Sequence, residues 1–263
     1  MKLRIATYNI HKGVSAFGRR PRILALKQAI DALGAELVFL QEVQGRHDLH
    51  AARHAHWPSQ AQHDFLAGAS HHSAYGMNAV YDHGHHGNAL LSRFPIMHSS
   101  NTDVSDHAFE QRGILHCVVP MSKVAVHCYV VHLGLFAAGR RRQTEGLIET
   151  IEASAPPDAP IIIAGDFNDW RNHLSEALCN RLGVSEVFDD ASAKPRLGDY
   201  LRSLAGRGPK SMPARTFPAG LPFLRLDRIY VRGFTVESAE VLHGALWARL
   251  SDHAPIVATL RLT

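Results

Sequence analysis

The sequence contains few cysteines and no long apolar run. Its three cysteines, Cys117, Cys128 and Cys179, are an odd number and lack the CxxC spacing of a zinc or redox pair. We therefore expect reduced, mostly buried thiols rather than a disulfide-stabilised scaffold. The longest apolar runs, PIIIAG and VAVHCYVVHL, are far shorter than the roughly 20 residues that span a bilayer. Integral membrane association is not expected.

A secretion signal is not expected either. The first residues, MKLRIATYNI, alternate apolar and polar side chains, which predicts a strand rather than the apolar segment of a signal peptide. We therefore expect a cytoplasmic protein. Of the 263 residues 46% are hydrophobic and 20% are charged, so neither a disordered nor a fibrous class fits. A chain of this length commonly forms one domain, and we predict a single catalytic domain over residues 1–263, acting as a monomer.

Positive charge and histidine are present in excess. The net charge of +4 permits an anionic partner such as nucleic acid without requiring one. Ten of the 19 histidines lie between His47 and His86. Imidazoles can bind metal ions or attract phosphate. No HExxH or similar paired spacing organises these histidines, however, so a solvated loop region is the favoured interpretation.

Apolar segments rich in Val, Ile and Leu predict a protein dominated by strands. The predicted strands are Leu3–Ile10, Glu36–Leu40, Asn88–Ser92, Gly113–Val119, Val124–His132, Pro160–Gly165, Leu226–Val231, Thr235–Leu242 and Ile256–Leu262. The predicted helices are Pro21–Leu33, Arg140–Ala153 and His173–Leu182. The turn in VPMSKV predicts a hairpin, so the sheets should be partly antiparallel. Two polar stretches, Gly45–Gly87 and Ala191–Leu221, are predicted to be loops with short helices, flanking a cleft.

Short acidic or amide motifs stand where predicted strands end. They are TYNIHKG, FLQEV, VVHLGL, IIIAGDFNDW, LRLDRIYV and LSDHAP. Taken singly, each has an ordinary explanation: Asp166 could cap a helix, Asn9 could form a turn, and Glu42 could pair with an arginine. Burying a carboxylate costs several kcal/mol, however, unless the charge is paired or bound to a cation. The recurrence of such motifs therefore favours a shared cation.

Together with GNALLSRFPI, these motifs resemble those of the endonuclease/exonuclease/phosphatase superfamily, the DNase I-like metal-dependent phosphoesterases. The resemblance covers almost the entire chain, and GDFN followed much later by SDH is its most specific part. It implies an α/β (α+β) fold, a four-layer αββα sandwich of two mixed sheets. It also implies a magnesium cofactor, with manganese as a substitute, because these ions prefer hard oxygen ligands.

The resemblance also assigns roles to individual residues. Glu42 would be the main metal carboxylate, Asn9 would help to hold the metal or its bound phosphate oxygen, and Asp252 would lie next to the metal, with the division of Asn9 and Asp252 between metal and phosphate left open. The implied catalytic residues are Asp166, which orients or deprotonates the attacking water, Asn168 and His132, which contact the phosphate, and Asp227, which positions His253. The residues expected to bind substrate are His11, Asn88 and Arg112, although strand-end hydrogen bonding explains the last two equally well. His11 stands where several nucleases of this family have an acidic residue, which favours one tightly held metal over two.

The implied activity is hydrolysis of phosphodiester bonds by in-line attack of a metal- and Asp-activated water. A nuclease acting on DNA or RNA is the leading interpretation, since nucleic acid is the most frequent substrate class among relatives. The alternative is a sphingomyelinase-like phospholipid or inositol phosphate phosphoesterase. Against the inositol phosphatase branch, Arg225 and Leu226 replace its usual Trp-Cys pair. A binding protein without turnover is disfavoured, because all the residues needed for metal, water and phosphate are present.

Overall fold

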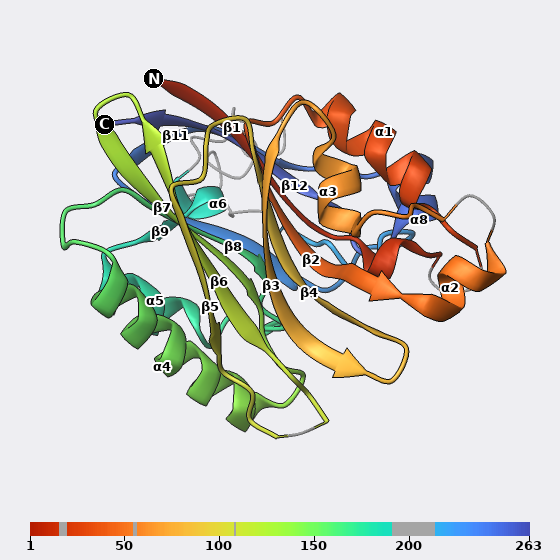
Figure 1. Ribbon diagram of the computed structural model, residues 1–263. Coiled ribbons are helices and arrows are strands. Elements are labelled where there is room, and N and C mark those ends of the chain that lie inside the picture. Colours follow the sequence, from red (N-terminus) through yellow and green to blue (C-terminus); the bar gives the residue numbers. More distant parts are fainter. Residues whose placement is uncertain (16–19, 55–56, 108, 191–213) are drawn as a thin grey trace, which may run out of the picture.

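Two six-stranded sheets pack face to face in the computed structural model, with helices on both outer faces (Figure 1). The structure describes residues 1–15, 20–54, 57–107, 109–190 and 214–263. The strand orders are β11-β12-β1-β2-β4-β3 and β5-β6-β7-β8-β10-β9. The pairs β1–β2 and β7–β8 are parallel and their other neighbours are antiparallel, so both sheets are mixed. The predicted four-layer αββα sandwich is confirmed.

The elements have the following bounds. The first sheet consists of β1 (Lys2–Asn9), β2 (Leu37–His47), β3 (His72–Tyr81), β4 (Gly84–Ser92), β11 (Phe234–Val241) and β12 (Ile256–Leu262). The second consists of β5 (His98–Asp103), β6 (Gly113–Met121), β7 (Val124–His132), β8 (Ile161–Asp166), β9 (Ser185–Glu186) and β10 (Asp227–Arg232). The helices are η1 (His11–Gly13), α1 (Ile23–Leu33), α2 (Asp48–Arg53), α3 (Gln62–Ala67), α4 (Ala137–Ser154), α5 (Ser175–Leu182), α6 (Val187–Asp190) and α8 (Ala245–Leu250).

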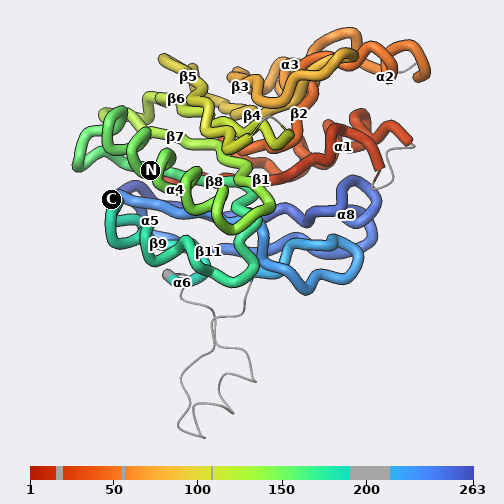
Figure 2. The backbone as a smooth tube through the Cα atoms, turned by 90° about the horizontal axis from the view of Figure 1, so that it is seen from below, coloured from red at the N-terminus to blue at the C-terminus, as the bar shows by residue number. Residues whose placement is uncertain are grey.

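The main core lies between the two sheets. Side chains alternate along a strand, so Leu115, Cys117 and Val119 of β6 all point into this layer. A second cluster lies under α1, where Leu26 and Ile30 recur at helical spacing and face the outer side of the first sheet. A third cluster lies under α4 and α5 on the second sheet. In Figure 2, α4 and α5 lie on one side of the strands and α1 and α8 on the other.

The long segment Gly45–Gly87 contains the short helices that its composition predicts, α2 and α3. It also contains a strand that was not predicted, β3, and β4 begins within it at Gly84. The expectation missed β3 because this strand lies at a sheet edge and buries few side chains. The edge strand β5 was missed for the same reason, since all its residues are exposed. Of the other expected loop, residues 191–213 lie outside the described part of the chain.

The predicted hairpin, the helix predicted at Arg140–Ala153 and the predicted state of the cysteines agree with the structure in most respects. The VPMSKV hairpin joins β6 to β7, and α4 begins three residues earlier than predicted. The cysteines are free, with Cys117 and Cys128 buried. None of the described helices combines the length and apolar character of a bilayer-spanning segment.

Many of the clustered histidines stack on other rings rather than standing free in solvent. His50 stacks on Trp57 with ring centroids 4.8 Å apart, and His63 stacks on Tyr75 at 4.7 Å. Packing on aromatic rings therefore accounts for these two histidines without a metal ion.

Candidate active site

Strand register places two of the predicted residues beside Asp166. This residue ends β8, and the register pairs it with His132 on β7 and with Asp227 on β10. Gly165, just before it, has φ +153°, and a Cβ there would lie 1.9 Å from the carbonyl oxygen of Val131. A glycine is therefore needed for the backbone to adopt this conformation beside β7.

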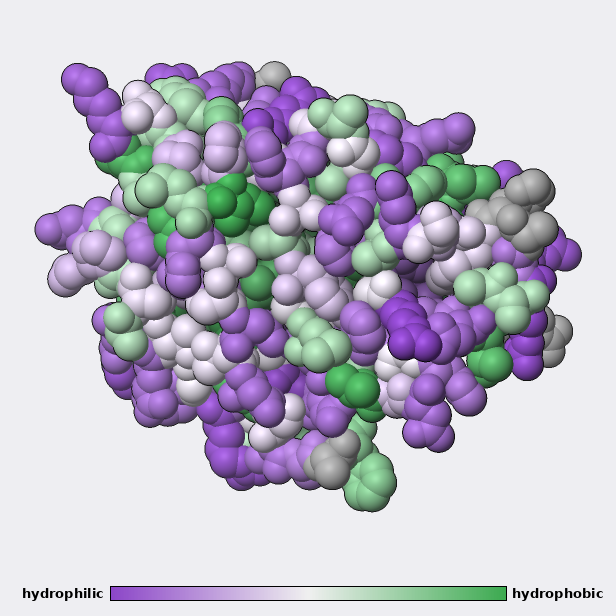
Figure 3. Space-filling view, in the orientation of Figure 1, coloured by the Kyte–Doolittle hydropathy of each residue, from purple (hydrophilic) through white to green (hydrophobic). Residues whose placement is uncertain are grey.

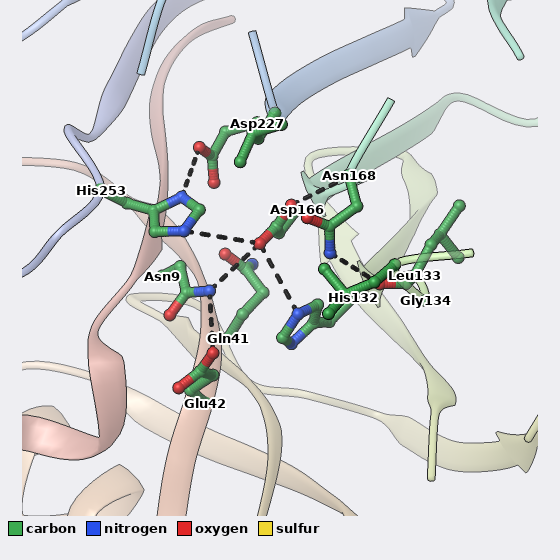
Figure 4. Close-up of polar contacts among 12 residues, drawn as sticks. Asn9, Gln41, Glu42, His132, Leu133, Gly134, Asp166, Asn168, Asp227 and His253 are labelled. Atoms are coloured by element: carbon green, nitrogen blue, oxygen red, sulfur yellow. Dashed lines mark hydrogen bonds and ion pairs between the residues drawn. The ribbon is translucent and has the colours of Figure 1, made fainter. Parts of the chain in front are cut away.

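The carboxylate of Asp166 is buried and lies among nitrogen atoms from two strand ends and from the loop that follows α8 (Figure 4). Its Oδ2 accepts a hydrogen bond from Asn9 Nδ2 at 3.2 Å. The same oxygen lies 3.6 Å from His132 Nε2 and 3.7 Å from His253 Nε2. Burial, aided by the charge of Asp227 and opposed by His253, raises the pKa of Asp166 to about 6. Such a carboxyl is ionised at neutral pH yet close to the pH at which a base works best.

His253 lies in the loop that follows α8. Its Nδ1 donates to Asp227 Oδ2 at 2.8 Å, and its backbone N–H donates to Ser251 Oγ. Burial alone would lower the pKa of His253, but the carboxylates of Asp227 and Asp166 raise it to about 10. At neutral pH His253 is therefore a buried imidazolium with a fixed orientation.

This pairing predicts a shift in the pH profile of Asp227→Asn protein. His253 is charged below its pKa, so activity that needs the charged form should decline as pH rises through about 10. Removing the Asp227 charge lowers that pKa, and the decline should move to lower pH by about 1–2 units. Rates of phosphoester hydrolysis from pH 6 to 11 measure this shift. The exposed Asp158→Asn serves as control. If the activity of Asp227→Asn protein declined at the same alkaline pH as that of wild-type protein, the pairing of Asp227 with His253 would be contradicted.

Glu42 reaches the same region through an irregularity in β2. The pairing with β4 shifts register between Leu40 and Val43, and Glu42 itself has φ +55°. This bulge re-aims the side chain. Glu42 Oε1 accepts from Asn9 Nδ2 at 3.4 Å, and Oε2 lies 3.3 Å from Lys12 Nζ. Burial would raise the pKa of Glu42, but the charge of Lys12 holds it well below its usual range.

His11 and Asp252 form a further pair at this end of the site. His11 Nδ1 lies 3.2 Å from Asp252 Oδ1. The hydrogen bond raises the pKa of His11, and the pKa of Asp252 is lowered by the same bond against the opposing effect of burial. The backbone N–H of His11 also donates to Asn9 Oδ1 at 3.1 Å. His11 thus faces Asp252, one of the predicted metal neighbours.

The other predicted residues differ in what their side chains contact. Asn168 has φ +51° and donates from Nδ2 to the carbonyl of Leu133 at 2.9 Å. Asn88 is fully buried and donates to the carbonyls of Gly113 and Val130, which favours a structural role. His132 is buried, and this burial, with the charge of Arg112, holds its pKa well below the usual range.

A pocket of about 370 Å³ adjoins Glu42 and His132, and Arg112 forms part of its wall. Its lining also includes residues that were not predicted: Lys12, Ala79, Val80, Tyr81, His86, Phe109 and Gln111. The sequence offered only weak signals for these residues. Lys12 lies within the first motif, TYNIHKG, and His86 lies two positions before Asn88.

Two groups of ligand atoms fit a divalent cation. Glu42 offers a buried oxygen, Oε2, that has no hydrogen-bond partner among the described residues and lies 3.3 Å from the ammonium nitrogen of Lys12. Asp166, Asp227 and His253 form a second group, whose ligand atoms lie within 4.8 Å of one another. In that group His253 is hydrogen-bonded to Asp227 through Nδ1 and forms an ion pair with Asp166 through Nε2, and these contacts explain the proximity of the three residues without a metal.

Comparisons with known proteins identify relatives and a shared fold. The chain is 42% identical over 262 residues to the uncharacterized protein YbhP of Escherichia coli K12, covering 98% of this chain and 96% of that protein. An endonuclease/exonuclease/phosphatase from Beutenbergia cavernae has a similar fold, with TM-score 0.72 and 19% identity over 99% of this chain and 72% of its own. Mannosyl-6-phosphatase from Bacteroides thetaiotaomicron has TM-score 0.72 and 17% identity over 99% of this chain and all of its own.

The family model described as Endonuclease/Exonuclease/phosphatase family matches residues 6–253, from the first strand to His253. That range contains every residue of the candidate site. The chain therefore belongs to the endonuclease/exonuclease/phosphatase family of phosphoester hydrolases.

Proposed function

We propose that this protein is a magnesium-dependent phosphodiesterase that acts on nucleic acid. The main support for the proposal is the set of side chains that surround Asp166. A buried carboxylate with a raised pKa lies between a buried imidazolium, a neutral imidazole and an amide. Perturbed titratable groups gathered in this way are typical of catalytic sites. Glu42, linked to the same amide of Asn9, supplies the carboxylate for a cation.

The proposed cation site uses oxygen donors. Glu42 Oε2, which has no hydrogen-bond partner among the described residues, is the kind of hard oxygen ligand that magnesium prefers. Asn9 and Asp252 would help to hold the ion. One carboxylate with few partners is sufficient, since magnesium usually keeps several waters and shares substrate phosphate oxygens. When bound, the cation would polarise a phosphoryl oxygen and stabilise the departing alkoxide.

The chain's own residues then divide the remaining work. Asp166 is proposed to accept the proton of the attacking water, a task that fits its pKa of about 6. His253, held by Asp227, would present a proton from Nε2 where negative charge grows on the phosphate. The neutral His132 and the amide of Asn168 would contact phosphoryl oxygens from the opposite side.

Charge and surface character favour nucleic acid as the substrate. The net charge is +4 and the isoelectric point is about 9.1, which would attract a polyanion. On the face shown in Figure 3 hydrophilic residues predominate, and hydrophobic ones are scattered in small groups. This pattern does not resemble a membrane-docking face.

A substrate panel tests the proposal. Plasmid DNA, abasic duplex, RNA, sphingomyelin, inositol phosphates and mannose 6-phosphate would each be incubated with magnesium and wild-type protein, with His253→Ala as the blank. We expect turnover of at least one nucleic acid at a rate about tenfold or more above the other classes. Turnover confined to lipid, inositol phosphate or sugar phosphate would contradict the nucleic acid assignment. Equal turnover by His253→Ala protein would contradict the site.

A further inference from the structure

The pocket beside Glu42 has more positive than negative charge. Lys12 and Arg112 are cationic lining residues, and Glu42 is the single carboxylate among the ten residues that line it. A divalent cation on Glu42 would satisfy that carboxylate and leave Lys12 without its partner at 3.3 Å. The charge of Lys12 would then be uncompensated and would attract an anion, while Arg112 keeps Glu110 as a partner.

Lys12 is held beside the pocket by a built backbone turn. His11, Lys12 and Gly13 all have positive φ, at 46°, 58° and 71°. Such a run is costly for residues with side chains and persists only where neighbours enforce it. Gln62 provides this support, because its buried Nε2 donates to the carbonyl of Lys12 at 2.9 Å and its Oε1 accepts from Gln44 N–H. The position of Lys12 is therefore defined by the fold and does not depend on the Glu42 pair alone.

Two other lining residues have polar atoms without partners. His86 Nδ1 and Arg112 Nε are buried and have no hydrogen-bond partner among the described residues. Buried polar atoms are nearly always satisfied, and exceptions often mark an absent ligand. Glu110 lies 3.5 Å from NH2 of Arg112 and accepts from the backbone N–H of Leu135, which tethers the guanidinium.

We propose that the pocket formed by Lys12, His86 and Arg112 binds a second phosphoryl group of the substrate, one that is not hydrolysed. This inference rests on the proposed function, because the pocket adjoins Glu42 and His132 of the proposed active site. The preferred substrate would then be a phosphoester that carries another phosphate near the scissile one. Guanidinium and ammonium groups are the usual partners of phosphate oxygens.

Equilibrium binding tests this inference without requiring turnover. Isothermal titration calorimetry in magnesium buffer would compare thymidine 5′-monophosphate with thymidine 3′,5′-bisphosphate. We expect wild-type protein to bind the bisphosphate about tenfold or more tightly than the monophosphate, from one or two charge-assisted hydrogen bonds. In Lys12→Met protein that ratio should fall about tenfold, and Lys12→Arg should retain most of it. Lys123→Met is the matched control, because Lys123 is exposed in the hairpin at the opposite end of β7 from His132.

Several results would overturn the inference. Equal binding of the two nucleotides by wild-type protein would do so, as would a bisphosphate preference that survives in Lys12→Met protein. Inorganic phosphate is the third ligand, and phosphate binding as tight as that of the bisphosphate would assign the pocket to the free anion instead. Hydrolysis of thymidine 5′-(p-nitrophenyl phosphate) is measured in parallel. A bisphosphate preference without hydrolysis would contradict the proposed function alone, and hydrolysis without the preference would contradict the pocket alone.

Discussion

Asp166→Asn is expected to reduce kcat for phosphodiester hydrolysis by about 1000-fold, in the middle of the range for loss of a general base. Asparagine keeps the shape of the side chain and can still contact Asn9 and the two imidazoles. It cannot accept a proton from water at neutral pH, however. Because Asp166 is proposed to act on the attacking water rather than to bind substrate, KM should change much less than kcat.

Steady-state rates with bis(p-nitrophenyl) phosphate measure this effect. Asp158→Asn is the control, since it removes the same charge from an exposed position. Thermal unfolding of both variants checks that the fold is retained. A variant at Asp166 that keeps more than about a tenth of wild-type kcat would contradict the assignment, because general-base contributions are at least about 100-fold.

Glu42→Gln is expected to raise the magnesium concentration needed for half-maximal activity by about tenfold or more. Glutamine keeps an oxygen donor but loses the negative charge, and carboxylates are the ligands by which proteins usually hold this ion. The measurement is the hydrolysis rate as a function of magnesium concentration. Glu176→Gln, an exposed substitution at the start of α5, is the control. An unchanged magnesium dependence would place the ion elsewhere, with the group of Asp166, Asp227 and His253 as the next candidate.

Much of the site could be predicted because its residues end strands that are apolar and regular. Asp166 and Asp227 interrupt runs of buried residues, and such interruptions are visible without a structure. The apolar runs alone predicted a protein dominated by strands with a partly antiparallel sheet, and the four-layer arrangement was implied by the family resemblance. The edge strand β5 was not predicted because it has no apolar residue to mark it.

The part of the site that could not be predicted depends on backbone irregularities and long-range pairs. The bulge that aims Glu42 and the positive φ of Lys12 have no distinct residue signature, since neither is a glycine. Buried ion pairs could not be predicted either, because they join residues that lie far apart in the sequence. Glu186 pairs with Arg225 and with the fully buried Arg228, and nothing in the spacing of these residues indicates the contact.

His11 illustrates how the structure refines a sequence argument. Because His11 stands where several nucleases of the family have an acidic residue, the sequence favoured a single metal. The structure adds that His11 pairs with the carboxylate of Asp252. A carboxylate predicted to lie next to the metal is hydrogen-bonded to an imidazole whose pKa is raised. We therefore propose that Glu42 is the dominant metal ligand and that Asp252 plays a secondary part.

The most direct test of the central claim is hydrolysis of bis(p-nitrophenyl) phosphate by wild-type protein that has been stripped with EDTA and then titrated with magnesium. We expect no measurable turnover in the chelator and full recovery as magnesium is restored, with manganese as an effective substitute. Turnover that continues undiminished in EDTA, or that no divalent cation restores, would contradict a metal-dependent phosphodiesterase centred on Glu42 and Asp166.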